Sequence, residues 1–263
     1  MRRLCSVAAA LLLVLGLMAG PAAGITNGEP DGDEHPHVGL LIFDIDGVPA
    51  WRCSGTLLSP TVMLTAGHCT FGTDGGRVWF DPEVVDPDYP FASDDSVEFD
   101  EIHTHPDYDD DAFFLHDVGV VILAEPVDAD RFGTLAEVGV LDRLAVRRGV
   151  QAQQFTPVGY GLQSVVPDLR ADLVRYQATV GLVDVRGTAG IPAGTSVMFT
   201  NNPGQRNTGG TCFGDSGGPV FMQDTDVIVA VTSFGLNANC VGVGGGYRVD
   251  TTDDQSFITA FLD

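Results

Sequence analysis

Short runs of hydrophobic residues, many of them β-branched, recur along the chain and are separated by Gly, Pro, Asn and Asp. Runs of this length and composition predict β-strands, and the residues between them predict turns. Many short strands without an internal repeat indicate an all-β protein, built as a sandwich or as a pair of barrels. The predicted strands lie at 38–43, 55–66, 117–123, 155–161, 178–185 and 226–235.

Two segments depart from this strand pattern. Residues 128–149 are rich in Ala, Leu and charged residues with a partly helical spacing, which predicts a linker with one helical turn between two β halves. Residues 252–262 predict a short C-terminal helix, in which Thr252 and Gln255 form a capping box. The residues expected to share its apolar face are Phe257, Ile258, Phe261 and Leu262.

The first 24 residues resemble a leader rather than part of the fold. Arg2 and Arg3 precede an apolar run at 7–18, which is too short to span a bilayer, and small residues follow at 22–24. We therefore expect a signal peptide at 1–24, a mature chain that begins near Ile25, and a secreted protein. No later run reaches about 18 apolar residues, so we expect no membrane anchor.

The composition narrows the class of partner. The 263 residues are 44% hydrophobic, enough for the core of one large β domain or of two small ones. There are 13 Lys+Arg, every one an Arg, against 36 Asp+Glu, which gives a formal net charge of -23. A charge of this sign argues against nucleic acids and anionic membranes as partners and favours solubility.

Four cysteines remain after the predicted leader, namely Cys53, Cys69, Cys212 and Cys240. An even number in an exported chain suggests two disulfides. The sequence allows three pairings, of which we favour the local one, Cys53 with Cys69 and Cys212 with Cys240. A zinc site is a weaker interpretation, because no CxxC pair is present.

Acidic residues at 72–100 leave two interpretations open, a calcium site or a solvated loop, and the loop is favoured because EF-hand spacing is absent. The carboxylates in question belong to Asp74, Asp81, Glu83, Asp86, Asp88, Asp94 and Asp95. The pairs at 35–37 and 103–105 each contain two histidines, which we interpret as ordinary strand residues. We expect neither a metal nor another cofactor.

The segment TCFGDSGGPV at 211–220 surrounds Ser216 with three glycines, a proline and an acid. A serine becomes a nucleophile when a base takes its proton and an acid orients that base. His68 directly follows an apolar strand in LTAGHC, and Asp117 begins the apolar run DVGVVIL, where an unpaired carboxylate would be costly. His116 is expected to point away from Asp117, as neighbours in a strand do.

These motifs resemble the trypsin/chymotrypsin family of serine proteases, in a secreted, bacterial-type member. ITNGEP resembles the family's mature N-terminus, LTAGHC its histidine motif and CFGDSGGP its serine motif. HPDYDDDAFFLHDVGVVIL resembles the strand before the catalytic acid, GYG at 159–161 the start of the second barrel, and SFG at 233–235 the substrate-binding strand. The motifs occur in family order and span residues 25 to about 250.

The resemblance implies one protease domain at 25–263 with two six-stranded antiparallel β-barrels and the active site between them. The first barrel would cover about 35–127, the linker 128–149, the second barrel about 150–250 and the helix 252–262. His68, Asp117 and Ser216 would be catalytic. The backbone N–H groups of Gly214 and Ser216 would form the oxyanion hole.

The resemblance also implies an activation pair, in which the free ammonium group of Ile25 meets the buried Asp215. Because the small residues at 22–24 end where Ile25 begins, signal peptidase itself could release this terminus.

The base of the primary substrate pocket would lie at Gly210, where trypsin-like members have an aspartate. Ser233 and Phe234 would belong to the substrate-binding strand, and Gly235 and Gly245 would line the pocket walls. An open pocket without a charge favours large apolar or aromatic residues before the cut. The chain differs from the usual family pattern at Gly67 and Phe234, but neither difference removes a chemical group from the triad.

The expected function is that of a monomeric secreted serine endopeptidase that acts on proteins or peptides through an acyl-enzyme. An alternative is a non-catalytic protease homologue that binds proteins through the same cleft. A third possibility is an esterase or another acyl hydrolase, which would share the serine chemistry.

Overall fold

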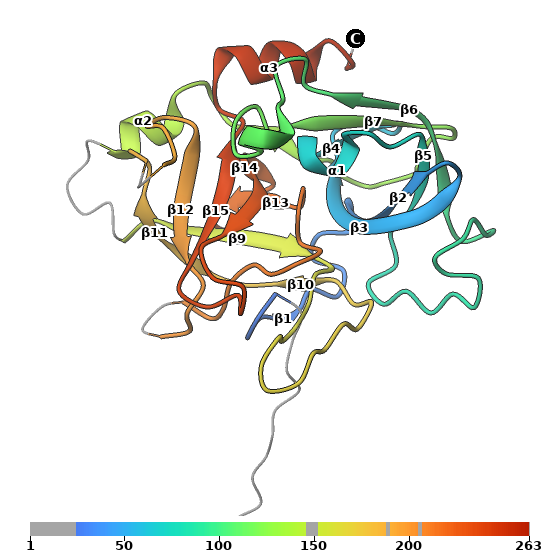
Figure 1. Ribbon diagram of the computed structural model, residues 1–263, viewed down its shortest axis with the longest axis horizontal. Helices are drawn as coiled ribbons and strands as arrows, with labels where there is room; N and C mark the ends of the chain where they lie inside the picture. Colours follow the sequence, from blue (N-terminus) through green and yellow to red (C-terminus); the bar gives the residue numbers. More distant parts are fainter. Residues whose placement is uncertain (1–24, 146–151, 188–189, 205–206, 263) are drawn as a thin grey trace, which may run out of the picture.

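The structure is a computed structural model that describes residues 25–145, 152–187, 190–204 and 207–262, so the predicted leader lies outside the described residues. Six antiparallel strands in its first half close into a barrel in the order β2-β3-β4-β7-β6-β5 (Figure 1). These strands are β2 (Val38–Ile45), β3 (Val48–Leu57), β4 (Val62–Thr65), β5 (Gly75–Trp79), β6 (Val97–Thr104) and β7 (Gly119–Leu123). Their inward apolar side chains, such as Leu41, Met63 and Val120, are fully buried.

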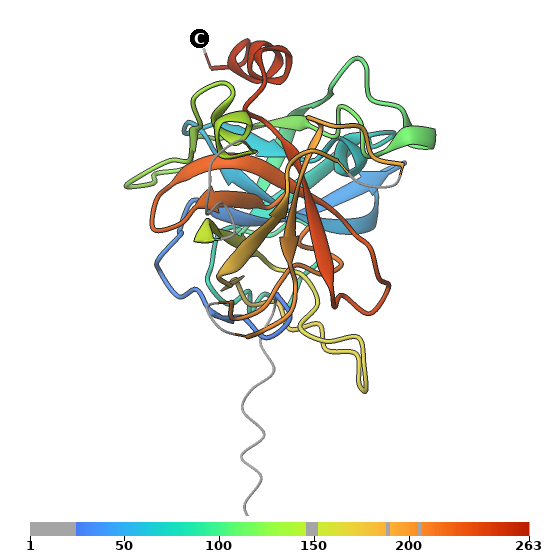
Figure 2. The ribbon, with the colours of Figure 1, turned by 90° about the vertical axis from the view of Figure 1, so that its left-hand side faces the viewer.

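A second barrel forms from the second half of the chain and faces the viewer in Figure 2. Its strands follow the order β9-β11-β12-β15-β14-β13, and β13 pairs back with β9 to close the ring. They are β9 (Gln154–Gly159), β11 (Val180–Asp184), β12 (Ser196–Thr200), β13 (Pro219–Met222), β14 (Val227–Gly235) and β15 (Val243–Arg248). The expectation of an all-β chain with two six-stranded antiparallel barrels is confirmed.

Short elements connect and extend the barrels. β1 (Glu29–Pro30) pairs with β10 (Tyr176–Gln177), and β8 (Thr134–Leu135) adds to β14 in parallel. The helical segments are α1 (Gly67–Thr70), η1 (Asp110–Ala112), α2 (Val140–Ala145) and α3 (Thr252–Thr259). α2 supplies a helical turn within 128–149, of which 146–149 lie outside the described residues. None of the helices in the described part of the chain has the length and hydrophobicity needed to cross a bilayer.

The C-terminal helix α3 packs along the first barrel (Figure 1). Phe257 lies against His105, and Phe261 lies against His103 of β6. The predicted capping box is shifted by one residue, because Thr251 has extended backbone angles and its hydroxyl accepts the N–H of Asp254 at 3.2 Å. Thr252 is instead the first helical residue.

Two further predictions for the C-terminal helix were wrong, one about the capping box and one about the apolar face. Gln255 does not fold back on the helix start, and its amide donates to the carbonyls of Ala136 and Val249. Ile258 is fully buried, but Leu262 is exposed and lies beyond the last helical residue, outside the apolar face.

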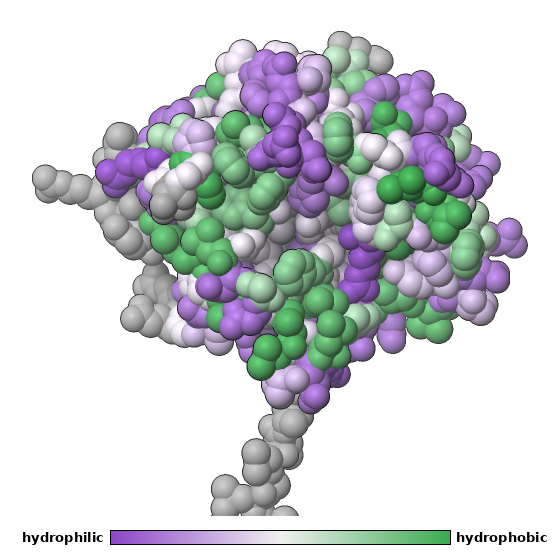
Figure 3. All heavy atoms as spheres, in the orientation of Figure 1, coloured by the Kyte–Doolittle hydropathy of each residue, from purple (hydrophilic) through white to green (hydrophobic). Residues whose placement is uncertain are grey.

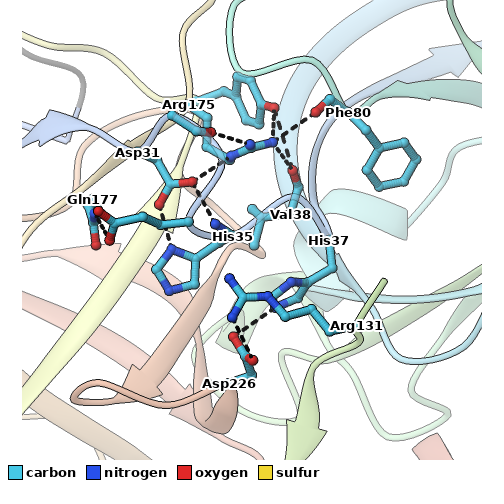
Figure 4. Close-up of polar contacts among 12 residues, drawn as sticks. Asp31, His35, His37, Val38, Phe80, Arg131, Arg175, Gln177 and Asp226 are labelled. Atoms are coloured by element: carbon cyan, nitrogen blue, oxygen red, sulfur yellow. Dashed lines mark hydrogen bonds and ion pairs between the residues drawn. The ribbon is translucent and has the colours of Figure 1, made fainter. Parts of the chain in front are cut away.

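A buried arginine joins the two barrels near the N-terminal segment (Figure 4). The guanidinium group of Arg175 donates to the carboxylate of Asp31 at 2.8 Å and to the carbonyl oxygens of Val38 and Phe80 at 3.1 and 2.8 Å. It also donates to the hydroxyl of Tyr160 at 3.0 Å. Because both charged partners are fully buried, this ion pair depends on the surrounding hydrogen bonds to compensate for lost hydration.

Candidate active site

The edge of the first barrel that faces the second brings together His68 and Asp117, which are 49 residues apart in sequence. The Nδ1 atom of His68 lies 2.9 Å from Oδ2 and 3.0 Å from Oδ1 of Asp117. The backbone N–H of His68, in the one-turn helix α1, donates to the same carboxylate at 2.8 Å. These contacts fix both the position and the orientation of the imidazole.

The contact through Nδ1 determines the chemistry available at the other ring nitrogen. A carboxylate accepts hydrogen bonds, so the proton of neutral His68 lies on Nδ1 and Nε2 is free to accept a proton. Burial lowers the pKa of His68, but the charge of Asp117 and its hydrogen bond outweigh burial and raise the pKa above 6.5. The pair therefore has the properties of a general base with an orienting acid.

Asp117 has a further partner that the sequence does not reveal. Its carboxylate is completely buried and accepts a short hydrogen bond from the hydroxyl of Ser233 on β14 of the second barrel. This contact explains how a buried charge remains stable, because several donors replace its hydration.

His116 points away from Asp117, toward His105 and Asp253, as expected. The physical reason differs from the one inferred, because the segment is not a strand there and His116 has a φ of 50°.

Ser216 lies in the turn that precedes β13 and lines the same cavity as His68. Its hydroxyl and the His68 ring form no hydrogen bond among the contacts of the described residues, although catalytic pairs without substrate are often separated beyond bonding distance. The backbone carbonyl of Ser216 accepts the N–H of Ser54 on β3 at 2.8 Å. The nucleophile candidate from the second barrel is thus attached to the first.

The glycines around Ser216 serve two different needs. Gly214 has a φ of 91°, and a Cβ there would lie 2.9 Å from Nε of Arg52 and 3.1 Å from Cα of Gly161. Gly217 has a φ of 76°, and a Cβ there would collide with the side chain of Thr65 in the first barrel. Glycine therefore permits both the turn and the close approach of the barrels.

The acid before Ser216 is buried under this turn. The carboxylate of Asp215 accepts the N–H groups of Gly161 at 2.7 Å and Cys212 at 2.8 Å. Burial raises its pKa to about 7, against the opposing effect of these hydrogen bonds and of the Arg52 charge. Such a carboxylate would gain strongly from a nearby cation.

Ile25 lies in the apolar cluster of the second barrel, and its side chain is fully buried. The next residue, Thr26, pairs with Gly210, whose N–H donates to the Thr26 carbonyl at 3.0 Å. In the uncut chain the nitrogen of Ile25 is an amide without charge. Its pairing with Asp215 therefore stays a prediction for the cut chain.

A cavity of about 270 Å³ opens beside Ser216. Three of the residues inferred for the substrate pocket line it, namely Ser233, Phe234 and Gly235. Gly210 and Gly245 are not among its lining residues, since Gly210 packs against Asn201 and Gly245 against the ring of Phe234. Lining residues that the sequence did not indicate include Thr211, Asn237 and Ala238.

A larger cavity of about 870 Å³ contains both His68 and Ser216. Five of the residues that line it are Trp or Phe. Hydrophobic patches lie among polar ones on the face seen in Figure 3. The exposed aromatic side chains along it are Trp51, Phe71, Phe113 and Phe213. Solvent-exposed aromatic side chains thus lie in the same cavity as Ser216 and His68.

Both disulfides have the favoured local pairing. Cys53–Cys69 fixes β3 next to His68, and Cys212–Cys240 closes one wall of the smaller cavity. Because Cys53 and Cys69 are oxidised, the close group Cys53, His68 and Cys69 offers no thiolate to a metal.

A second group, His105, His116 and Asp254, brings its ligand atoms within 4.8 Å of one another. The two imidazole rings stack at 4.8 Å with 21° between their planes. Nδ1 of His105 accepts the N–H of Asp107 at 3.2 Å, which leaves the proton of neutral His105 on Nε2. This geometry favours a contact with Asp253, 3.7 Å from both rings, over a metal.

The acidic residues of 72–100 belong to none of the three groups of possible metal ligands in the described chain. Asp86 accepts hydrogen bonds from Trp79 and Ser93, and Asp74 accepts the backbone N–H of Asp46. Asp86 thus organises its own loop and Asp74 holds the turn between β2 and β3, and such structural hydrogen bonds favour the solvated-loop interpretation.

The segment from Gly214 to Gly218 also fits the G-x-S-x-G pattern of α/β-hydrolases. That pattern requires a helix directly after the serine, and here the antiparallel strand β13 follows. The arrangement is therefore unlike the nucleophile elbow of those esterases.

Comparisons with known proteins identify the family of the chain. The family model described as Trypsin matches residues 26–252. Brachyurin from Leptuca pugilator is 28% identical over 231 residues, which cover 87% of this chain and 90% of brachyurin. Serine protease 1 from Drosophila melanogaster is 29% identical over 222 residues, 82% of this chain and 77% of that protein.

A solved structure of HL collagenase shares the fold. It superposes with a TM-score of 0.72 at 20% identity and covers 90% of this chain and 98% of that chain. With the family model matched over most of the sequence, the chain belongs to the trypsin family of serine endopeptidases.

Proposed function

We propose that the protein is a secreted, monomeric serine endopeptidase in which Ser216, His68 and Asp117 form the catalytic triad. The observation that carries the proposal is the His68–Asp117 contact, with Nδ1 held 2.9 Å from the carboxylate and with Ser216 on the same cavity. This arrangement leaves Nε2 as the acceptor for the hydroxyl proton.

In the proposed reaction, Oγ of Ser216 attacks the peptide carbonyl carbon while Nε2 of His68 takes the hydroxyl proton. The carbonyl oxygen becomes an oxyanion, which the N–H groups of Gly214 and Ser216 stabilise. His68 then gives its proton to the amine, the C–N bond breaks, and an acyl-enzyme remains. Water, activated by the same imidazole, hydrolyses the ester and restores Ser216.

A serine-directed fluorophosphonate tests the proposal. We expect one label per processed chain, located on Ser216, together with cleavage of denatured protein substrates. Ser216→Ala should abolish labelling and reduce kcat on the order of 10⁶-fold. A processed, folded protein that neither reacts with the reagent nor cleaves peptides would instead be the non-catalytic binding homologue.

The lining of the smaller cavity supports a preference for large apolar or aromatic residues before the cut. The residues that line it include no Asp, Glu, Lys or Arg, and Phe234 contributes an aromatic wall. A peptide panel that varies the residue before the cut should show the highest kcat/KM for Phe, Tyr or Leu. Preferential cleavage after Arg or Lys would contradict this preference.

Activation by cleavage before Ile25 is part of the same proposal. The buried Asp215, whose pKa burial raises to about 7, would bind the new ammonium group and become a stable carboxylate. The intact mass and N-terminal sequence of protein collected from the culture medium test both secretion and the site of the cut. An active secreted form that begins at another residue would overturn the Ile25–Asp215 pair.

A further inference from the structure

Ser54 is a buried hydroxyl at the meeting point of the two barrels. It lies on β3 directly after Cys53, and no part of it is exposed to solvent. Its hydroxyl donates to the carbonyl of Gly214 at 3.0 Å and accepts the N–H of Tyr160 at 3.0 Å. One side chain of the first barrel thus holds two backbone segments of the second.

The contact with Gly214 matters because this residue carries a proposed oxyanion donor. A glycine with a φ of 91° has no side chain that would keep its peptide planes in place. The carbonyl of Phe213, which shares a peptide plane with the Gly214 N–H, accepts the N–H of Leu162 at 2.7 Å. The next carbonyl, that of Gly214 itself, is held by Ser54.

Both peptide planes next to Gly214 are therefore anchored, one through Phe213 and one through Ser54. Without either anchor the glycine would be free to rotate, and its N–H would no longer be held toward the developing oxyanion. Donors that are held in place before the reaction stabilise the transition state more than donors that must reorient.

We infer that Ser54 is a positioning residue for the oxyanion hole. It does not touch the substrate and acts by fixing the conformation of Gly214. The inference rests on the proposed serine-protease function, because it concerns the same site. It adds a residue from the first barrel to a set of donors that lies wholly on the second.

Thr56 offers a matched control on the same strand. It is also completely buried, two residues further along β3, but its hydroxyl has no hydrogen-bond partner within the described part of the chain. Thr56→Val removes this hydroxyl and preserves the shape of the side chain, whereas Ser54→Ala removes the bonded hydroxyl. The two variants separate loss of the Gly214 contact from loss of a buried hydroxyl in general.

The experiment compares wild type, Ser54→Ala and Thr56→Val in processed, active form. We expect kcat to fall about 10- to 100-fold in Ser54→Ala, somewhat less than when an oxyanion donor is removed outright, with KM within about twofold of wild type. The affinity for a peptide aldehyde, whose adduct places an oxyanion in the same position, should fall by a similar factor. Thr56→Val should match wild type in both measurements.

Several results would overturn the inference. They are an unchanged kcat in Ser54→Ala, an equal loss in Thr56→Val, or a rise in KM without loss of aldehyde affinity. If only part of the Ser54→Ala protein folds, kcat is taken per active site titrated with the serine reagent, so that the comparison does not depend on the yield of folded protein. An inactive wild type that the serine reagent does not label would instead reject the proposed function itself, and the role of Ser54 with it.

Discussion

Asp117 accepts hydrogen bonds from the backbone and ring of His68 and from the hydroxyl of Ser233. Asp117→Asn keeps the size of the side chain but lets its amide nitrogen face Nδ1, which favours the wrong tautomer of His68. We predict a fall in kcat on the order of 10⁴-fold with little change in KM. Steady-state kinetics on a fluorogenic peptide would measure this, and a loss below tenfold would argue against the assigned role of Asp117.

The same pair determines how activity depends on pH. Neutral His68 is the active form, and Asp117 raises the pKa of His68 above 6.5 against the effect of burial. Activity should therefore decline as the pH falls through this raised pKa. In Asp117→Asn the raising charge is absent, so the acid limb of the residual activity should move to lower pH. Profiles of kcat/KM for both proteins would test this, and coincident acid limbs would contradict it.

The sequence was informative about the chemical groups and less so about their neighbours. His68, Asp117 and Ser216 could be selected because each lies in a short motif with a chemical reason. The contacts Ser233–Asp117 and Ser54–Gly214 join residues 116 and 160 positions apart, respectively, and no local pattern marks them. The pocket residues inferred at Gly210 and Gly245 lie behind the lining, because Asn201 and Phe234 fill the space beside them.

At the scale of elements, the sequence indicated strands where burial is nearly continuous. β2 and β14 carry long buried apolar runs and were predicted close to their observed bounds. The run at 55–66 is instead the hairpin of β3 and β4, with Pro60 in its turn. β6 and β15 were missed, since β6 exposes acidic residues and β15 contains three glycines that pack against neighbouring strands.

The helix cap provides a prediction at this scale. The Thr251 hydroxyl accepts the N–H of Asp254 and caps the helix. Thr252 is already the first helical residue and is not the cap. Thr251→Ala should lower the free energy of unfolding by about 1 kcal/mol. Thr252→Ala should change it by less than about 0.5 kcal/mol. Urea denaturation of both variants measures the difference, and equal effects would refute the cap at Thr251.

Across the whole molecule, Arg175 connects the N-terminal segment to both barrels. Arg175→Met leaves the fully buried carboxylate of Asp31 without its guanidinium partner, and we predict a loss of about 3–5 kcal/mol in the free energy of unfolding. The double variant Asp31→Asn/Arg175→Met should recover part of this loss, because it also removes the stranded charge. Denaturation of the single and double variants tests the coupling, and strictly additive losses would argue against it.

His37 gives the molecule a further pH dependence, which is unrelated to catalysis. It is fully buried between the barrels, and neither ring nitrogen is hydrogen-bonded to a described residue, although Nε2 lies 3.5 Å from the carboxylate of Asp226. Burial lowers its pKa to about 4, assisted by the positive charges of His35, Arg131 and Arg175 and opposed by Asp226 (Figure 4).

The sign of the effect on stability follows from proton uptake. An unfolded histidine binds its proton near pH 6.5, whereas folded His37 stays neutral down to about pH 4. Unfolding between these values therefore takes up a proton, and His37 makes the free energy of unfolding fall with decreasing pH, by at most about 1.4 kcal/mol per unit. Above pH 6.5 the group is neutral in both states and contributes no such slope.

His37→Leu removes the titrating group without breaking a hydrogen bond to any residue that the structure describes. The difference in unfolding free energy between variant and wild type cancels the contribution of every titrating group that does not interact with His37. We predict that this difference is constant from pH 7 to 8 and shifts in favour of the variant as the pH falls from about 6.5 to 4.5. Urea denaturation across this range measures it, and parallel stability curves would show that folded His37 accepts a proton as readily as the unfolded chain does.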